Sequence, residues 1–126
     1  SAVTAGINGT IAQYNNLRKD LLLSQHIKST DTDASTITFD MTNNLHSVTL
    51  AGNRTLAVTN VSTNQIFTII LKQDGTGSRT VTWWSGIKWV GAVAPTLTTT
   101  ASRWDIFLFV YDGTNYFGSI AGQNYG

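Results

Sequence analysis

Residues 103–120 constrain the fold of this chain most, because two runs of β-branched and aromatic residues flank an Asp-Gly pair there. An Asp-Gly step between two such runs is a strong signal for a hairpin, since glycine accepts the positive φ of a tight turn. The sequence therefore predicts paired antiparallel strands at residues 104–111 and 115–120, with Asp112 and Gly113 in the turn.

The first of these strands is apolar on both faces, because successive side chains of a strand point to opposite sides. One face carries Trp104, Ile106, Leu108 and Val110, and the other carries Asp105, Phe107, Phe109 and Tyr111. Such a strand is central, with the domain core on one side and another cover, such as a second subunit, on the other. We expect Leu108 in the core, and Phe107 and Phe109 in an interface with another chain.

Apolar and polar residues alternate along most of the chain from residue 36, which is typical of half-buried strands. The pattern predicts further strands near residues 36–41, 48–50, 56–58, 65–73, 79–84 and 87–90. Asp74-Gly75-Thr76-Gly77 marks a second hairpin turn. About eight strands joined by short turns predict an antiparallel β-sandwich of jelly-roll type.

The N-terminal part of the chain has a different pattern. We expect an extended arm at residues 1–9, an amphipathic helix at 10–26 and a solvated linker at 27–35 before a β domain at 36–126. The apolar stripe of the helix either covers the domain's own sheet or associates with other helices. The residues expected to contact a neighbour from the arm and the helix are Val3, Ile7, Ile11, Tyr14, Leu17 and Leu21.

Composition excludes several classes of function. Charged residues make up 12% of the chain, about half of the usual share, and the net charge is +1. A surface of this kind lacks the clustered cations that bind nucleic acid. No apolar run approaches the length of about 20 residues that a membrane span requires. Without cysteine the chain has no disulfide or thiolate metal site.

The sequence also lacks a pattern that would carry catalysis. No serine or aspartate is placed to orient His26 or His46, so we expect structural or solvated histidines. Asp31 and Asp33 stand two apart, but calcium takes six to eight oxygen ligands, so a solvated linker is the preferred interpretation. We therefore expect no enzyme activity, no cofactor and no metal, and little change of stability between about pH 5 and 9.

Aromatic residues offer one possible binding surface. Trp84, Trp89, Tyr116 and Tyr125 could form a platform that stacks on sugar rings, since flat aromatic faces match a pyranose. The preferred alternative places the tryptophans in the core or in a subunit interface, where aromatic residues are enriched.

Several turns carry a resemblance to a known family. They lie in residues 52–56, 71–83, 95–98 and 111–118, and they include Gly52-Asn53-Arg54, Gln73-Asp74-Gly75-Thr76-Gly77 and Tyr111-Asp112-Gly113-Thr114. These segments resemble a β domain found in structural proteins of tailed bacteriophages, at fibre ends or in head-decorating proteins. Residues 12–20 also resemble a helix of phage virion proteins.

The resemblance implies a non-enzymatic virion protein, either a capsid decoration or a head or tail fibre component. It implies a homotrimer on the virion surface, outside the cell when assembled, with partners such as a major capsid or fibre-base protein. The N-terminal arm is then the expected attachment to the particle. Two alternatives stay open: a module that binds host surface carbohydrate through the aromatic residues, and a secreted filament subunit.

Overall fold

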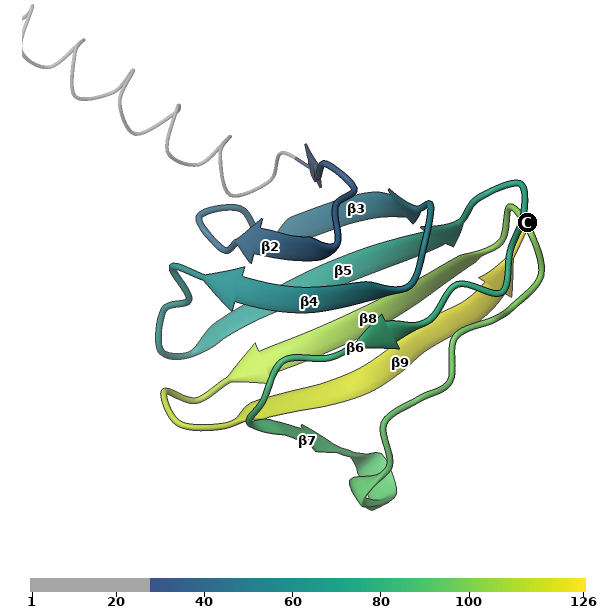
Figure 1. The fold of residues 1–126 in the computed structure, drawn as a ribbon. Coiled ribbons are helices and arrows are strands. Elements are labelled where there is room, and N and C mark those ends of the chain that lie inside the picture. Colours follow the sequence, from purple (N-terminus) through teal and green to yellow (C-terminus); the bar gives the residue numbers. More distant parts are fainter. Residues whose placement is uncertain (1–27) are drawn as a thin grey trace, which may run out of the picture.

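The computed structural model describes residues 28–126, which form two β-sheets packed against each other (Figure 1). The elements are β1 (Lys28–Thr30), β2 (Thr36–Asp40), β3 (Leu45–Leu50), β4 (Arg54–Thr59), β5 (Gln65–Gln73), β6 (Val81–Thr82), β7 (Ile87–Trp89), a 3₁₀ turn (Val90–Ala92), β8 (Trp104–Tyr111) and β9 (Tyr116–Tyr125). The large sheet has the order β1-β3-β5-β8-β9-β7, and the small sheet has the order β2-β4-β6. The predicted mainly β, two-sheet architecture is confirmed.

The pairing of the strands differs from the prediction. Strands β1 to β6 alternate between the large and the small sheet, so strands two apart in the chain become neighbours. These neighbours run parallel, as do β7 and β9, whereas β5–β8 and β8–β9 are the antiparallel pairs among the described strands. The antiparallel pairing was therefore wrong for the pairs that the first six strands form with one another. The alternating pattern allowed this error because it reports a buried face and not the strand direction.

The core lies between the sheets and is built by the predicted alternation. In β2, Ile37 and Phe39 are buried and their neighbours are exposed. In β5, the alternate residues Phe67, Ile69 and Leu71 are buried in the same way. Apolar burial of this kind supplies most of the driving force for folding.

The hairpin of β8 and β9 is confirmed, and β9 continues beyond its predicted end to Tyr125. The Asp112 carboxylate accepts hydrogen bonds from the backbone N–H groups of Thr114 (2.8 Å) and Asn115 (2.7 Å). Gly113 has φ of 101°, the positive value that the turn motif predicted.

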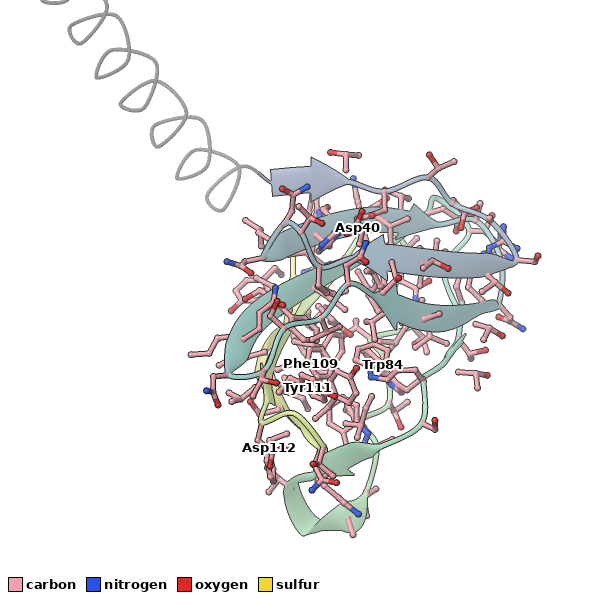
Figure 2. All side chains as sticks on the ribbon, turned by 90° about the vertical axis from the view of Figure 1, so that its left-hand side faces the viewer. Asp40, Trp84, Phe109, Tyr111 and Asp112 are labelled. Atoms are coloured by element: carbon pink, nitrogen blue, oxygen red, sulfur yellow. The ribbon has the colours of Figure 1, made fainter. Side chains whose placement is uncertain are left out.

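The faces of β8 were assigned the wrong way round. Phe107 and Phe109 are 0% exposed, whereas Leu108 is 37% exposed. Phe109 stacks on Phe67 with a centroid distance of 5.2 Å, and it lies between the sheets with Trp84 (Figure 2). The aromatic rings fill the space between the layers, so Phe107 and Phe109 cannot contact another subunit in this fold.

The Asp74 turn does not form a hairpin. It leads the chain from β5 in the large sheet to β6 in the small sheet, where β6 pairs with β4. The Asp74 carboxylate accepts from the N–H groups of Thr76 (3.1 Å) and Gly77 (3.0 Å). Strand β6 has only two residues, Val81 and Thr82, in place of the six predicted.

The predicted linker at residues 27–35 contains β1, which pairs with β3. Asp31 lies against His46 and Asp33 against Arg54, so neither carboxylate is a solvated linker group. The predicted arm at 1–9 and helix at 10–26 lie outside the described residues. Within residues 28–126, no helix is long and apolar enough to span a membrane.

Candidate functional site

The side of the large sheet that faces away from the core is apolar over β5, β8 and β9. Ile66 is 58% exposed, Phe117 48%, and Leu108 and Val110 37% each. Ile66 is the register partner of Val110, and Val110 is the partner of Phe117, so their side chains form a row across three strands. We call this surface the outer face; its residues are Ile66, Thr68, Ile70, Ile106, Leu108, Val110, Phe117 and Ser119.

Charges lie only at the margins of the outer face. At one end, the Lys72 ammonium lies 4.2 Å from the centroid of the Trp104 ring, a cation–π contact. Lys88 is on β7 at the edge of the sheet, as the register partner of Phe117. The outer face itself contains no ionisable residue. The expectation that strand β8 would carry a second apolar side outside the domain core is confirmed, with the two faces exchanged. The expected cover of this side by another chain stays a prediction.

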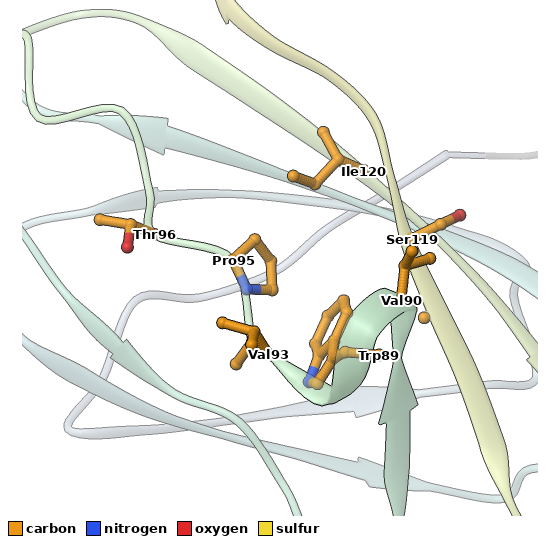
Figure 3. Close-up of a pocket in the computed structure, with 9 residues that line it drawn as sticks. Trp89, Val90, Val93, Pro95, Thr96, Ser119 and Ile120 are labelled. Atoms are coloured by element: carbon orange, nitrogen blue, oxygen red, sulfur yellow. The ribbon is translucent and has the colours of Figure 1, made fainter.

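A groove of about 450 Å³ lies beside β9. Ile120 is the register partner of the buried Phe107 yet is 46% exposed, and it lines this groove. Figure 3 shows Trp89 between the segment of Val93 and Pro95 and the strand that carries Ile120. The residues that line the groove are Trp89, Val90, Val93, Ala94, Pro95, Thr96, Gly118, Ser119 and Ile120.

Glycine at position 118 lets the Trp89 indole lie against β9. A Cβ atom at Gly118 would be 2.7 Å from Cζ3 of Trp89, which is closer than real contacts allow. The same indole packs at 5.1 Å from the Trp83 ring and 5.6 Å from the Phe109 ring. Trp89 therefore connects the wall of the groove to the aromatic part of the core.

The four residues of the predicted sugar platform do not form one surface. Trp84 packs on Phe109 at 4.9 Å and on Tyr116 at 5.6 Å, and its indole N–H is buried without a hydrogen-bond partner. The ring of Tyr116 stacks on the ring of Tyr111 with a centroid distance of 4.3 Å. Burial raises the pKa of the Tyr116 hydroxyl, and the nearby Tyr111 raises it further. Tyr125 is the register partner of Trp104 at the far end of β9. Only Trp89 lines the groove.

Three ion pairs were not predicted from the sequence. Arg54 contacts Asp33 through two hydrogen bonds of 2.8 and 2.7 Å, and this contact lowers the pKa of Asp33. Arg79 lies 2.9 Å from Asp74. The third contact is a hydrogen bond between His46 and Asp31 at 2.9 Å, which becomes an ion pair when the imidazole is protonated and which corrects the expectation that no aspartate approaches a histidine.

The arginine pairs have a signal in the sequence, because Arg54 and Arg79 each stand beside a turn motif. The His46 pair has none, because Asp31 is 15 positions away.

The buried Asp105 is structural. Its carboxylate accepts hydrogen bonds from the N–H groups of Thr98 (2.7 Å) and Asn124 (3.0 Å) and from the amide of Gln123 (3.2 Å). These bonds hold the irregular segment before β8 and the end of β9 against the sheet.

Groups for metal binding are lacking in the described part of the chain, where no three His, Cys, Asp or Glu side chains gather. His26 and the predicted interface residues of the arm and helix lie outside the described residues. These residues are Val3, Ile7, Ile11, Tyr14, Leu17 and Leu21.

One family model matches the chain. It is described as "Putative phage tail fibre C-terminal domain" and covers residues 35–116, which is 82 of the 126 residues. Comparison with curated proteins and comparison with solved structures each gave no match. The match confirms the resemblance to phage fibre domains that the turn motifs indicated. The chain therefore belongs to the phage tail fibre C-terminal domain family.

Proposed function

We propose that this structural phage protein forms the C-terminal part of a tail fibre and associates with copies of itself through the outer face. The observation that carries the proposal is the row of exposed Ile66, Val110 and Phe117 across three neighbouring strands. Large apolar patches on soluble proteins mark interaction sites, and obligate interfaces resemble a core cut in half.

A second copy of the chain is the occupant that best fits the outer face. Because the outer face has no ionisable residue, two identical copies can meet there without repulsion between like charges. Lys72 and Lys88 lie at the margins, where solvent can still reach them. A trimer is the assembly that the resemblance to fibre proteins favours.

Light scattering of the full chain tests this assembly. Val110→Lys places a charge in the outer face and should convert an oligomer to a monomer at micromolar concentration. Thr38→Lys is the matched control, because Thr38 is exposed on the small sheet. A monomeric parent chain, or equal masses for the Val110 variant and the parent, would contradict self-association through this surface.

We further propose that residues 1–9 attach the protein to another virion protein, such as a fibre-base or major capsid protein. The arm contains Val3 and Ile7, which could dock in a groove or extend a sheet edge. Deletion of residues 1–9 should leave the β domain folded and abolish attachment to particles. Normal occupancy of the deleted protein on particles would argue against the arm. The same measurement distinguishes fibre from decoration, because a decoration protein occupies many positions on the head.

A second candidate function is recognition of host surface carbohydrate in the groove. The specific observation in its favour is an indole wall, Trp89, together with Thr96 in one groove of about 450 Å³. Aromatic faces with a few polar groups are suited to sugar rings. This site replaces the four-residue platform that the sequence offered as an alternative.

Glycan-array binding of the full chain tests the groove. Val93 is 72% exposed at the groove, so Val93→Arg should block a bound sugar while leaving the fold unchanged. Thr38→Arg serves as the control on the small sheet. Loss of binding in the Val93 variant alone supports the site, whereas absence of any glycan signal or equal binding by both variants would remove this candidate.

A further inference from the structure

The imidazole of His46 is fully buried on β3 and faces oxygen atoms at both of its nitrogens. Its Nδ1 atom lies 2.9 Å from Oδ2 and 3.2 Å from Oδ1 of Asp31. Its Nε2 atom lies 2.9 Å from the backbone carbonyl oxygen of Asn43. The ring of Phe39 packs against it edge-on, with a centroid distance of 5.4 Å.

Both of these oxygen groups are acceptors. A backbone carbonyl only accepts, and an ionised carboxylate only accepts, whereas a neutral imidazole has a single N–H to donate. Both hydrogen bonds therefore form together only when each ring nitrogen carries a proton. The extra proton belongs to the ring because an ordinary aspartic acid is far more acidic than an imidazolium.

We propose that His46 is a buried imidazolium, and that its pair with Asp31 is a latch that holds β1 on the large sheet and weakens as pH rises. Strand β1 pairs with β3 over three residues at the edge of the sheet. Asp31 follows directly, and its N–H donates to the carbonyl of Ser47 at 2.8 Å. The latch thus adds a charged contact next to a short edge strand, which is where local opening begins most easily.

The charges around the ring favour the protonated form. Asp31 approaches from the connection after β1, and Asp40 lies at the end of β2. The hydrogen bonds and ion pairs of the His46 ring involve no cation among the described residues. The charged partner of the ring in these contacts, Asp31, is an anion.

The sign of the pH effect follows from the proton count. In the closed state His46 keeps its second N–H, whereas in the opened state a solvated histidine loses that proton above about pH 6.5. Opening of β1 then releases a proton, so the closed state is favoured at low pH and opening becomes easier as pH rises. We therefore expect the opening of β1 to depend on pH, which the sequence did not predict.

Nitrogen-15 NMR of the two histidine side chains, across pH 5 to 9, tests the protonation directly. His26→Gln assigns the signals in the full chain. We expect both ring nitrogens of His46 to carry protons at pH 7. In Asp31→Asn, the introduced amide can donate to Nδ1, so His46 should become neutral. Asp33→Asn makes the same change of charge at the Arg54 pair, and it should leave His46 protonated.

Hydrogen exchange of the β1 amides, expressed as protection factors, tests the latch. Release of one proton on opening lowers protection by up to about tenfold per pH unit. We expect this loss in the parent and in Asp33→Asn, and a pH-independent protection in Asp31→Asn. A neutral His46 at pH 7, or the same pH profile of protection in all three proteins, would overturn the proposal.

Discussion

Truncation of a side chain in β8 should lower the free energy of unfolding much more on the buried face than on the outer face. Phe107 is completely buried, so Phe107→Ala leaves a cavity and should lower the free energy of unfolding by about 3–5 kcal/mol. Leu108 is 37% exposed on the outer face, so in the monomeric chain Leu108→Ala should cost less than about 1 kcal/mol. Urea unfolding of both variants at one chain concentration measures the difference. Similar losses for the two variants would mean that the core does not lie on the Phe107 side.

The sequence could not decide between these faces because each carries bulky apolar residues. Charged residues are mostly exposed, so the single charge, Asp105, would favour its own face as the exposed one. The structure places Asp105 inside, where three hydrogen bonds compensate the burial of its carboxylate. A charge in a strand thus indicates the outer side only when no partner is available for it.

Two glycines of one turn should respond differently to alanine. Gly77 has φ of 75°, and a Cβ atom there would lie 2.5 Å from the carbonyl oxygen of Thr99. At Gly75, no atom lies within 4 Å of such a Cβ. Gly77→Ala should therefore destabilise the fold by several kcal/mol, on the order of other strained or overpacked sites, whereas Gly75→Ala should change stability little. Thermal unfolding of the two variants checks this, and equal midpoints would contradict the turn geometry.

Two carboxylates should control stability in acid. The pKa of Asp74 is lowered from 3.8 to about 2. The largest cause is the hydrogen bond from Arg79, and hydrogen bonds from backbone N–H groups add to it. The backbone N–H of Thr42 is the largest cause that lowers the pKa of Asp40 to about 2. Because both pKa values are depressed in the folded state, their stabilisation is present above about pH 4 and is lost as pH falls toward 2.

Unfolding of Asp74→Asn and of the parent between pH 2 and 6 measures this contribution. We expect the variant to be less stable than the parent at pH 6 and to lose less stability on acidification. A parallel decline of the two proteins between pH 4 and 2 would show that Asp74 does not titrate with folding.

At the scale of elements, the hairpin of β8 and β9 could be predicted because its information is local. Asp112 and Gly113 define the turn, and the flanking aromatic residues define the strands. The parallel pairs are not local in this sense, because the partner of β2 is β4 and the partner of β3 is β5. Short turns suggested hairpins, but those between β2 and β5 lead the chain from one sheet to the other.

The candidate surfaces were only partly predictable for the same reason. That β8 is apolar on both sides follows from its alternation, and this predicted a second covered face. The groove requires Trp89 to meet Gly118, which is 29 positions away and becomes its neighbour only through the parallel pairing of β7 with β9. The carbohydrate alternative placed Trp84 and Tyr116 at the surface, but Trp84 packs on Phe109 and on Tyr116.

At the scale of the whole molecule, the large sheet has one side packed against the small sheet and one apolar side, the outer face, that is open. The family match supports a fibre protein, and the open side is suited to the assembly of such a protein from identical chains. The small sheet offers no comparable surface, because the outward residues of β2 are Thr36, Thr38 and Asp40. Association should therefore use the large sheet.

Site-directed cross-linking tests whether the outer face joins two copies of the chain. The protein has no cysteine, so Leu108→Cys introduces a unique thiol in the outer face and Thr38→Cys introduces one on the small sheet. At a low micromolar concentration of the full chain, a short bis-maleimide should convert the Leu108→Cys variant to covalent dimers. The Thr38→Cys variant should not form covalent dimers under the same conditions. Equal cross-linking of the two variants, or none at Leu108→Cys, would contradict assembly through the outer face.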